Sequence, residues 1–340
     1  MLKASFIGKE ISGVHFNQEL LQYIDSEDKL KLIDLKTGAE AQRIIKLTSS
    51  TGNFIIKKIE PQKAQEEAGH IKLINGLYPS FFPKMHALDS KQGVYIIDYI
   101  DGASLDSIIK FEAKAEFSLP NKDIIFKAIE HLSVLHNRTN RAYTSNYHEV
   151  IVIKRMNDII NCPIVNTHSS KINVKFLCEI EIFNSLFYNY LNKALSVYKK
   201  ILPEKESIIH GDAHLGNIIA IDSCVKFIDP RIRWDSTQNK EPGYFDGLYD
   251  VSCLAHSIIA NCILKTSVNN CKSDQLKMFF DWSMELLNKY NNSYSLGEKN
   301  RYIIYLACCL LGNLRYVEFT PNKDSFMRTV YAVAYLIEQI

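Results

Sequence analysis

Four side chains that can transfer protons or bind metal ions lie within the short segment IIHGDAHLGNII, residues 208–219. They are His210, Asp212, His214 and Asn217, and an apolar pair stands at each end of the segment. Because short apolar runs of this kind form buried strands, we expect the polar residues between them to form a tight loop at the edge of a core. Such a loop can present Asp212 and Asn217 to one ligand.

A second carboxylate follows the next apolar run, in the segment VKFIDP, residues 225–230. Asp212, Asn217 and Asp229 therefore offer oxygen donors on two adjoining loops at strand ends. Mg²⁺ prefers oxygen ligands and is usually held by one or two carboxylates together with substrate phosphates. The set suits a magnesium ion bound to a nucleotide, and it leaves one aspartate to act as a base.

Length and composition favour a globular protein that binds small partners. The chain has 340 residues, is 46% hydrophobic and has a net charge of +2, so we expect neither nucleic acid nor a membrane surface as a partner. The first ten residues lack the apolar core of a signal peptide, and the apolar stretch 302–312 is too short to span a bilayer. With eight cysteines and no C-x-x-C pair, the sequence predicts a reduced, cytoplasmic protein.

The first hundred residues have the pattern of a sheet with one helix. A helix is expected from Pro61 to Gly76, because proline is favoured in a first turn and glycine at a helix end. Five strands are expected, at residues 29–35, 41–49, 53–60, 81–89 and 93–101. The segment DGASLDS then indicates a hinge near residue 100.

The rest of the chain has mainly helical periodicity. Helices are expected at residues 121–137, with Asn121 as the cap, and at 174–202, 248–264, 274–290, 299–316 and 323–339. The sequence thus predicts an α+β protein with a small antiparallel sheet lobe at residues 1–99 and a larger helical lobe at 100–340.

The polar loop resembles a known catalytic motif. H-G-D-x-H-x-x-N followed by I-D-P is similar to the catalytic loop and metal-binding aspartate of the aminoglycoside phosphotransferase and choline kinase superfamily, which is related to protein kinases. The resemblance extends over nearly the whole chain. It implies a bilobal protein kinase-like fold and a small-molecule O-kinase that uses Mg²⁺ with ATP or GTP.

The same resemblance implies roles for the loop residues. Asp212 would be the catalytic base, while Asn217 and Asp229 would bind Mg²⁺. His210 would hold the loop in place rather than bind a ligand. His214 would either orient the acceptor or fill space.

The segment NFIIKK, residues 53–58, resembles the strand that provides the family's nucleotide lysine. Its alignment makes Lys57 the phosphate-binding residue, with Lys58 as the alternative if the strand register differs by one residue. Glu67 would pair with this lysine, because its spacing to the apolar helix face favours it over Glu66.

Two further segments resemble nucleotide-binding parts of the family. GVYIIDYIDGASLDS is similar to the hinge whose backbone binds adenine, at Asp98, Tyr99 and Ile100. The loop KTGAEAQ has one glycine instead of three, so the expected cover of the nucleotide there depends on Gly38 and neighbouring amides.

The spacing of two histidines separates this chain from protein kinases. His136 ends a helix in the segment LSVLHN, and 73 residues separate it from His210. Small-molecule kinases use such an insertion to build an acceptor pocket, so a protein substrate is not expected. Asp250, in YFDGLYDVSCLAHSI, would accept hydrogen bonds from the catalytic-loop backbone or from His210.

The acceptor is predicted only as a class. Arg231 and Arg233 could equally hold an anionic or a neutral acceptor, and Trp234 and Tyr244 could stack on a sugar ring or simply pack within the segment. Carboxylates that would suit a cationic acceptor are Asp235, Glu241 and Asp246. The leading hypothesis is a kinase for a sugar, sugar phosphate or related metabolite. The alternatives are an antibiotic phosphotransferase and a catalytically silent kinase-like protein that binds nucleotide.

Overall fold

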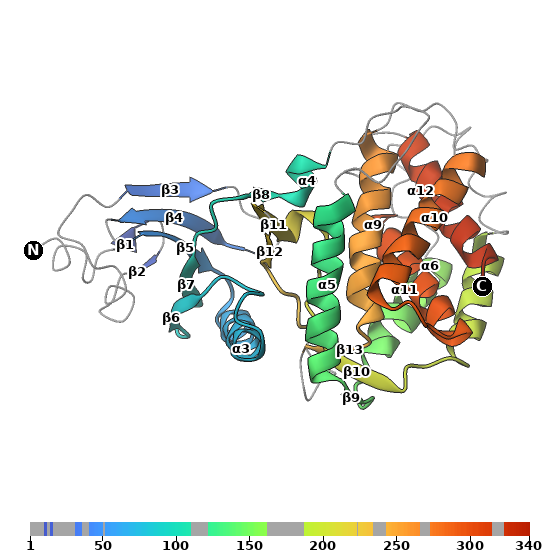
Figure 1. Cartoon of the computed structure of the whole chain (residues 1–340), viewed down its shortest axis with the longest axis horizontal. Coiled ribbons are helices and arrows are strands. Elements are labelled where there is room, and N and C mark those ends of the chain that lie inside the picture. The colour runs from blue at the N-terminus through green and yellow to red at the C-terminus, as the bar shows by residue number, and fades with distance from the viewer. Residues whose placement is uncertain are drawn as a thin grey trace, which may run out of the picture. The chain divides into compact units, whose positions relative to one another are not determined.

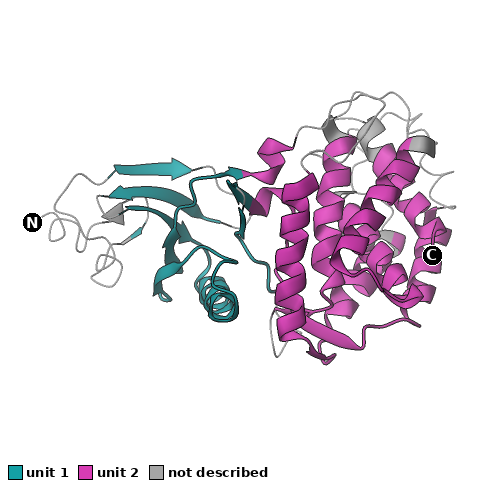
Figure 2. Cartoon of the chain, viewed as in Figure 1, with its two compact units in different colours: residues 1–103, 219–232 teal, residues 104–218, 233–340 magenta. Residues whose placement is uncertain are grey.

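The computed structural model divides the chain into two compact units (Figure 2). Unit 1 contains Met1–Ala103 and Ile219–Ile232, and unit 2 contains Ser104–Ile218 and Arg233–Ile340. The boundary expected after residue 99 left residues 219–232 with the helical lobe, whereas in the structure this segment packs with the sheet. The residues that the structure describes are 10–11, 14–15, 31–35, 41–49, 52–109, 122–161, 187–222, 224–233, 243–265, 273–314 and 323–340.

Unit 1 is built on the predicted five-stranded antiparallel sheet (Figure 1). Its strands, in spatial order, are β3 (Lys31–Leu35), β4 (Arg43–Ser49), β5 (Gly52–Lys58), β7 (Val94–Asp98) and β6 (Met85–Asp89). Alternating residues of β4 and β5, including Ile45, Leu47, Phe54 and Ile56, are buried on one face, where β2 (Val14–His15) adds Val14. A two-residue strand, β1 (Glu10–Ile11), pairs with β2.

Helix α3 (Pro61–Leu77) packs against the other face of this sheet. Its buried side begins with Ala64 and includes Glu67, Ala68, Ile71 and Ile74, which recur at helical spacing. The sheet presents Tyr95 and Ile97 toward this side. Because side-chain direction alternates along a strand, Lys57, the partner of Tyr95 in the β5–β7 register, lies on the same face.

The segment that contains Asp229 is attached to unit 1 by a small sheet and an aromatic contact. Strands β8 (Ala103–Ser104), β11 (Ile218–Ile221) and β12 (Cys224–Phe227) form a three-stranded sheet in the order β12-β11-β8. The Phe227 N–H donates to the Phe81 carbonyl at 2.9 Å, and the two rings stack with centroids 4.4 Å apart. Both phenylalanines are fully buried, so the end of β12 has a defined position in unit 1.

Unit 2 is mainly helical, as the periodicity predicted. Its helices are α4 (Leu105–Ile108), α5 (Lys122–Thr139), α6 (Arg155–Asn161), a helix at 187–198, α9 (Leu248–Lys265), α10 (Ser273–Tyr290), α11 (Leu296–Leu314) and α12 (Lys323–Glu338). Helix α9 packs against α11, α10, α12 and α5 (Figure 1). The start of the helix predicted at 174–202 and the expected cap Asn121 lie outside the described residues.

Short elements that the sequence pattern did not predict hold the polar loop of unit 2. Strands β9 (Arg141–Ala142), β10 (Lys205–Ile208) and β13 (Tyr244–Phe245) form a sheet in the order β13-β10-β9. A π-helical turn, η1 (Glu149–Lys154), precedes α6, and a 3-10 turn, η2 (Leu215–Asn217), ends the loop. Among the described helices, none has the length and apolarity needed to cross a bilayer.

Candidate active site

In unit 1 the structure brings together Lys57, Glu67 and Asp229. The Lys57 Nζ donates to Glu67 Oε2 at 3.0 Å and to Asp229 Oδ1 at 3.1 Å. Lys57 is 6% exposed, whereas Lys58 on the opposite face of β5 is half-buried. Of the two candidate pairs, Lys57 and Glu67 are thus the residues that contact each other, whereas Glu66 is half-buried and accepts from Gln62.

Glu67, the partner of Lys57, accepts a second hydrogen bond that fixes its position. Tyr95, on the neighbouring strand, donates its hydroxyl to the same Glu67 oxygen at 2.7 Å. Side chains from α3, β5 and β7 therefore meet at the Glu67 carboxylate. Sequence reasoning missed Tyr95, although its position opposite Lys57 in an antiparallel pair would have indicated it once the register was known.

The charges of this group are strongly coupled. Burial lowers the pKa of Lys57, but Asp229 and Glu67 outweigh burial, so that its pKa is raised above the ordinary value and the amine stays protonated. Burial raises the pKa of Glu67, and Lys57 and the Tyr95 hydroxyl oppose that rise. The two neighbouring carboxylates offset the free-energy cost of burying the Lys57 cation.

Asp229 has an unusual backbone. Its φ is +52°, in the left-handed region that few residues other than glycine adopt. Such conformations are often found at functional sites, because the surrounding structure must stabilise them. The Asp229 side chain is 43% exposed, so its carboxylate can bind a ligand in addition to Lys57.

In unit 2 the polar loop is anchored by Asp250. The N–H groups of His210 and Gly211 donate to the two Asp250 oxygens, each at 2.7 Å. The His136 Nε2 lies 3.0 Å from Asp250 Oδ2. Gly211 has a φ of +82°, which glycine adopts without strain and which turns both amides toward the carboxylate.

These contacts determine the ionisation of Asp250, which is fully buried. Burial by itself would raise its pKa, but hydrogen bonding and charge from His136, with a contribution from His210 and the Gly211 amide, lower it below the ordinary value. Asp250 is therefore a charged anchor for the loop, and the sequence-based interpretation of its contacts to the backbone matches this geometry.

The remaining loop contacts orient Asp212 and Asn217. The Asn217 Nδ2 donates to the Asp212 carbonyl at 3.0 Å, and Asn217 is 8% exposed. The Asp212 N–H donates to His210 Nδ1 at 3.2 Å, and the Asp212 side chain is 41% exposed. Unit 2 thus presents one open carboxylate, and the buried Asn217 amide ties the loop together.

The two loop histidines differ in their surroundings. His210 is fully buried and accepts the Asp212 N–H, which fits a residue that holds the loop. His214 is half-exposed, caps η2 by accepting the Gly216 N–H at 3.0 Å, and has Nε2 4.0 Å from Asp212 Oδ2. The capping contact gives His214 a structural role, while its distance to Asp212 leaves it able to contact an acceptor.

Two of the hinge residues predicted to bind adenine donate their backbone N–H groups to carbonyls within unit 1. The Asp98 N–H donates to Lys84, and the Tyr99 N–H donates to Asn53, each at 3.0 Å. The Asp98 side chain lies 2.5 Å from His86 Nε2. Gly38, the other nucleotide-binding residue expected from the sequence, lies outside the described residues.

The residues expected to line the acceptor pocket have mixed outcomes. Asp246 is buried, pairs with Arg301 at 2.8 Å and accepts from the Tyr305 hydroxyl at 3.2 Å, so its charge is compensated within unit 2. The ring of Tyr244 has the Arg141 guanidinium 3.5 Å from its centroid. Trp234, Asp235 and Glu241 lie outside the described residues.

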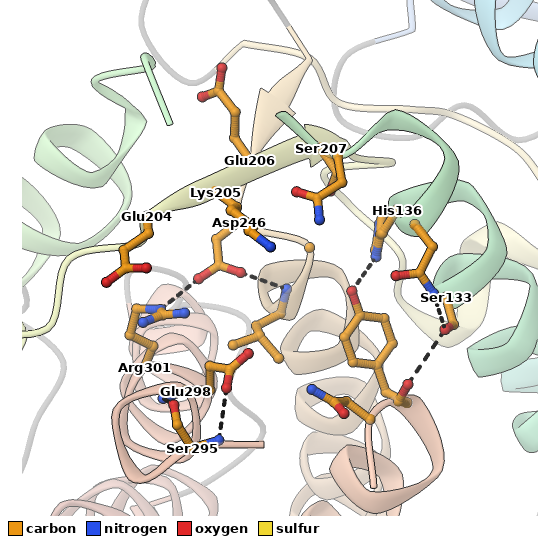
Figure 3. Close-up of a pocket in the computed structure, with 16 residues that line it drawn as sticks. Ser133, His136, Glu204, Lys205, Glu206, Ser207, Asp246, Ser295, Glu298 and Arg301 are labelled. Carbon is orange, nitrogen blue, oxygen red and sulfur yellow. Dashed lines mark hydrogen bonds and ion pairs between the residues drawn. The ribbon is translucent and has the colours of Figure 1, made fainter. Parts of the chain in front are cut away.

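Unit 2 also contains a polar cavity of about 490 Å³ (Figure 3). His136 lies in its wall, and the dashed line in the figure joins its ring to a tyrosine hydroxyl, that of Tyr290, at 2.9 Å. Its lining includes both acidic and basic side chains, among them Glu204, Lys205, Glu298 and Arg301. Its described lining contains none of residues 210–217, so this cavity is not the site of Asp212.

Solved structures share this arrangement of elements. Choline kinase from Cryptosporidium parvum matches with a TM-score of 0.53 and 12% identity over 92% of each chain. A Haemophilus somnus protein provisionally assigned as a fructosamine-3-kinase matches with 0.53 and 14% identity, over 100% of this chain and 99% of that one. For a choline/ethanolamine kinase family protein from Mesorhizobium loti the values are 0.50 and 14%, over 89% and 92%.

Comparisons with protein-family models and with curated proteins found no match. At the identities above, the structural likeness shows the fold. The chain has the kinase-like fold of the choline kinases and aminoglycoside phosphotransferases, with a small antiparallel sheet and a larger helical part, which confirms the fold class predicted from the catalytic-loop motif.

Proposed function

We propose that this protein is a phosphotransferase that moves the γ-phosphate of ATP to a hydroxyl group of a small molecule. The proposal rests above all on Lys57, which is buried between Glu67 and Asp229 in unit 1. Phosphoryl transfer requires a positioned cation on the nucleotide phosphates and a carboxylate for the metal, and this group offers both. A catalytically silent protein has no chemical need for such a group together with the anchored Asp212.

The oxygen donors fit a magnesium ion. Asp229 offers an exposed carboxylate, and Asn217 has an amide oxygen, since its hydrogen bond to the Asp212 carbonyl uses the amide nitrogen. These are the hard ligands that Mg²⁺ prefers, in the small number that leaves room for phosphates and water. When bound, Mg²⁺ supplies positive charge that neutralises the transferring phosphate.

In this proposal the chain's own residues position the reactants and move one proton. Lys57, aligned by Glu67, contacts the nucleotide phosphates. The acceptor hydroxyl oxygen forms a bond to the γ-phosphorus while the bond from this phosphorus to the β–γ bridging oxygen breaks, and ADP leaves. The hydroxyl proton passes to the Asp212 carboxylate, which the Asp250-anchored loop presents at 41% exposure.

We further propose a sugar, sugar phosphate or related metabolite as the acceptor, ahead of a cationic antibiotic. Of the three carboxylates that would favour a cation, the described one, Asp246, is already neutralised by Arg301 within unit 2. An antibiotic phosphotransferase remains the second candidate, because the sequence contains Asp235 and Glu241 in the same segment.

The test is transfer of labelled γ-phosphate from ATP, with GTP in a parallel arm, to pools of sugars, sugar phosphates, amino alcohols and aminoglycosides in the presence of Mg²⁺. We expect one pool to be labelled. Asp212→Asn should lose transfer but still bind nucleotide, and Lys57→Met should lose about a hundredfold or more in kcat/KM. Lys58→Met is the matched control and should stay within about threefold of the wild type. Nucleotide binding without transfer to any pool would instead support the silent protein.

A further inference from the structure

The segment formed by η1 and α6 contains a half-buried cation, Arg155, that pairs with no described carboxylate. Glu149 pairs with His148 at 3.4 Å, and Lys154 pairs with Asp158 at 3.1 Å. Arg155 follows directly, yet its Nη1 donates to a backbone oxygen, that of Cys308 in α11, at 3.0 Å. Throughout the part of the chain that the structure describes, no carboxylate pairs with Arg155.

The surroundings of Arg155 are apolar or neutral. Both η1 and α6 pack on α11 (Figure 1), and a Cβ at Gly312 would lie 3.8 Å from the Arg155 Nη1. The Arg155 guanidinium is always charged in a protein. Burial raises the pKa of Tyr249 well above its ordinary value, so this phenol is neutral near pH 7 and does not balance the charge.

Arg155 is half-buried, and a cation in this position that has no ionic partner and whose donors are mostly unused is suited to an anion. Isolated charges are rarely buried without a partner. The guanidinium has five N–H donors in a planar fork that matches the oxygens of a phosphate or a carboxylate. The Cys308 carbonyl occupies part of this fork.

Helix α9 contacts both the loop that contains Asp212 and the part of α11 to which Arg155 donates a hydrogen bond. The first turn of α9 contains Asp250, whose oxygens hold His210 and Gly211, the residues just before Asp212. Tyr249 is the neighbour of Asp250, and its pKa is raised by the Asp212 carboxylate and lowered by the Arg155 guanidinium. One turn on, the Cys253 Sγ lies 3.6 Å from the Cys309 Sγ in α11, beside Cys308. The part of α11 to which Arg155 donates therefore packs on α9 about one turn from the residue that holds the Asp212 loop.

We propose that Arg155 binds the anionic group, a phosphate or a carboxylate, of the hydroxyl acceptor, and that the acceptor is an anionic metabolite such as a sugar phosphate. The inference rests on the proposed kinase function. It assigns opposite tasks to two groups of unit 2: Asp212 takes the proton from the reacting hydroxyl, and Arg155 holds the far, negatively charged end of the same molecule.

The first experiment measures kcat and KM for matched acceptors: a hexose, its phosphate ester and the corresponding uronic acid. We expect the wild type to favour the anionic members by about tenfold or more in kcat/KM. Arg155→Met should raise KM about tenfold for the anionic acceptors and leave the neutral hexose unchanged. Comparison of the ester with the acid distinguishes phosphate from carboxylate recognition.

Two further variants separate binding from folding. Lys154→Met, next in sequence but exposed and paired with Asp158, should match the wild type on every acceptor. Arg155→Lys keeps the charge and loses the fork, so it should fold if Arg155→Met does not and should give an intermediate KM. An equal loss on neutral and anionic acceptors would show that Arg155 only supports α11, and the inference would fail.

A binding measurement keeps this result independent of catalysis. Titration calorimetry of the wild type with hexose phosphate, uronic acid and inorganic phosphate should show binding that Arg155→Met loses and Lys154→Met retains. Transfer to neutral acceptors alone would overturn the inference while the kinase proposal stands. Anion binding that depends on Arg155, without transfer to any acceptor, would keep the anion site and reject the kinase. No anion binding that depends on Arg155 would reject the site.

Discussion

At the scale of single residues, the charged side chains of the candidate site have defined hydrogen-bond and ion-pair partners. Asp250 is held by two backbone amides and by His136, and Lys57 by two carboxylates. Each charge is compensated where it is buried, as the low dielectric of the interior requires. Arg155 differs because its compensation is not supplied by the described chain, and this difference identifies it as a binding residue.

The depressed pKa of Asp250 predicts how stability depends on pH. The unfolded carboxyl takes up a proton near its ordinary pKa, and the folded one only at lower pH. The stabilisation from Asp250 is therefore complete above about pH 5 and is lost as the pH falls through the folded pKa. Asp250→Asn, which cannot accept from both amides as a charge does, should cost about 3 kcal/mol at pH 6.

Urea denaturation between pH 6 and pH 3 checks this expectation. The difference in free energy of unfolding between the wild type and Asp250→Asn should narrow as the pH falls. Parallel curves would mean that Asp250 does not titrate with the depressed pKa. Asp281→Asn, an exposed carboxylate paired with Lys277, should change stability at pH 6 by no more than about 0.5 kcal/mol.

At the scale of elements, a close approach between two backbone segments determines the position of β11. Gly102 precedes β8, and a Cβ placed on it would lie 2.3 Å from the Ala220 carbonyl oxygen and 2.8 Å from the Ile219 side chain in β11. Real Cβ contacts are not this short, so β11 approaches the chain here because residue 102 is glycine.

Gly102→Ala should accordingly displace β11, which directly follows Asn217 in the chain. We expect a loss of about 1–3 kcal/mol in the free energy of unfolding, with reduced phosphotransfer. Gly69→Ala in α3 is the control, because nothing lies within 4 Å of its Cβ and alanine favours helix. It should be neutral or stabilising by up to about 1 kcal/mol, and a Gly102→Ala protein as stable as this control would contradict the expectation.

At the scale of the whole molecule, the chain crosses between its two units more than once. Residues 219–232 leave unit 2 after the catalytic loop, pack with the sheet of unit 1 and return at Arg233. Asp229, the aspartate proposed to bind the metal, therefore belongs to the same unit as Lys57, although in sequence it lies among the helices. The stacked rings of Phe81 and Phe227 hold this segment against the rest of unit 1.

Phe227→Ala should therefore loosen unit 1 rather than unit 2. The fully buried ring makes the expected cost about 3–5 kcal/mol. Hydrogen exchange should show lost protection in β4, β5 and α3, while α9 and α11 in the same molecule serve as the internal reference. Equal loss in both units, or loss confined to α9, would contradict this assignment of residues 219–232.

Much of the fold could be predicted from the sequence because its causes are local. The alternation of Ile45 and Leu47 indicates a strand, and the helical spacing of Ala64, Ala68 and Ile71 indicates the face that α3 buries. The segment 208–219 likewise identifies its polar loop, because an uninterrupted run of chemistry-bearing residues between apolar flanks is visible without any tertiary contact.

What only the tertiary structure decided depends on partners distant in sequence. The choice between Lys57 and Lys58 follows from the pairing of β5 with β7, since a shift of one residue reverses side-chain direction. The hydrogen bond from Tyr95 to Glu67 and the packing of residues 219–232 with the sheet have the same origin. The uncompensated charge of Arg155 is the extreme case, because a sequence shows which charges a chain contains, whereas only packing determines which of them meet.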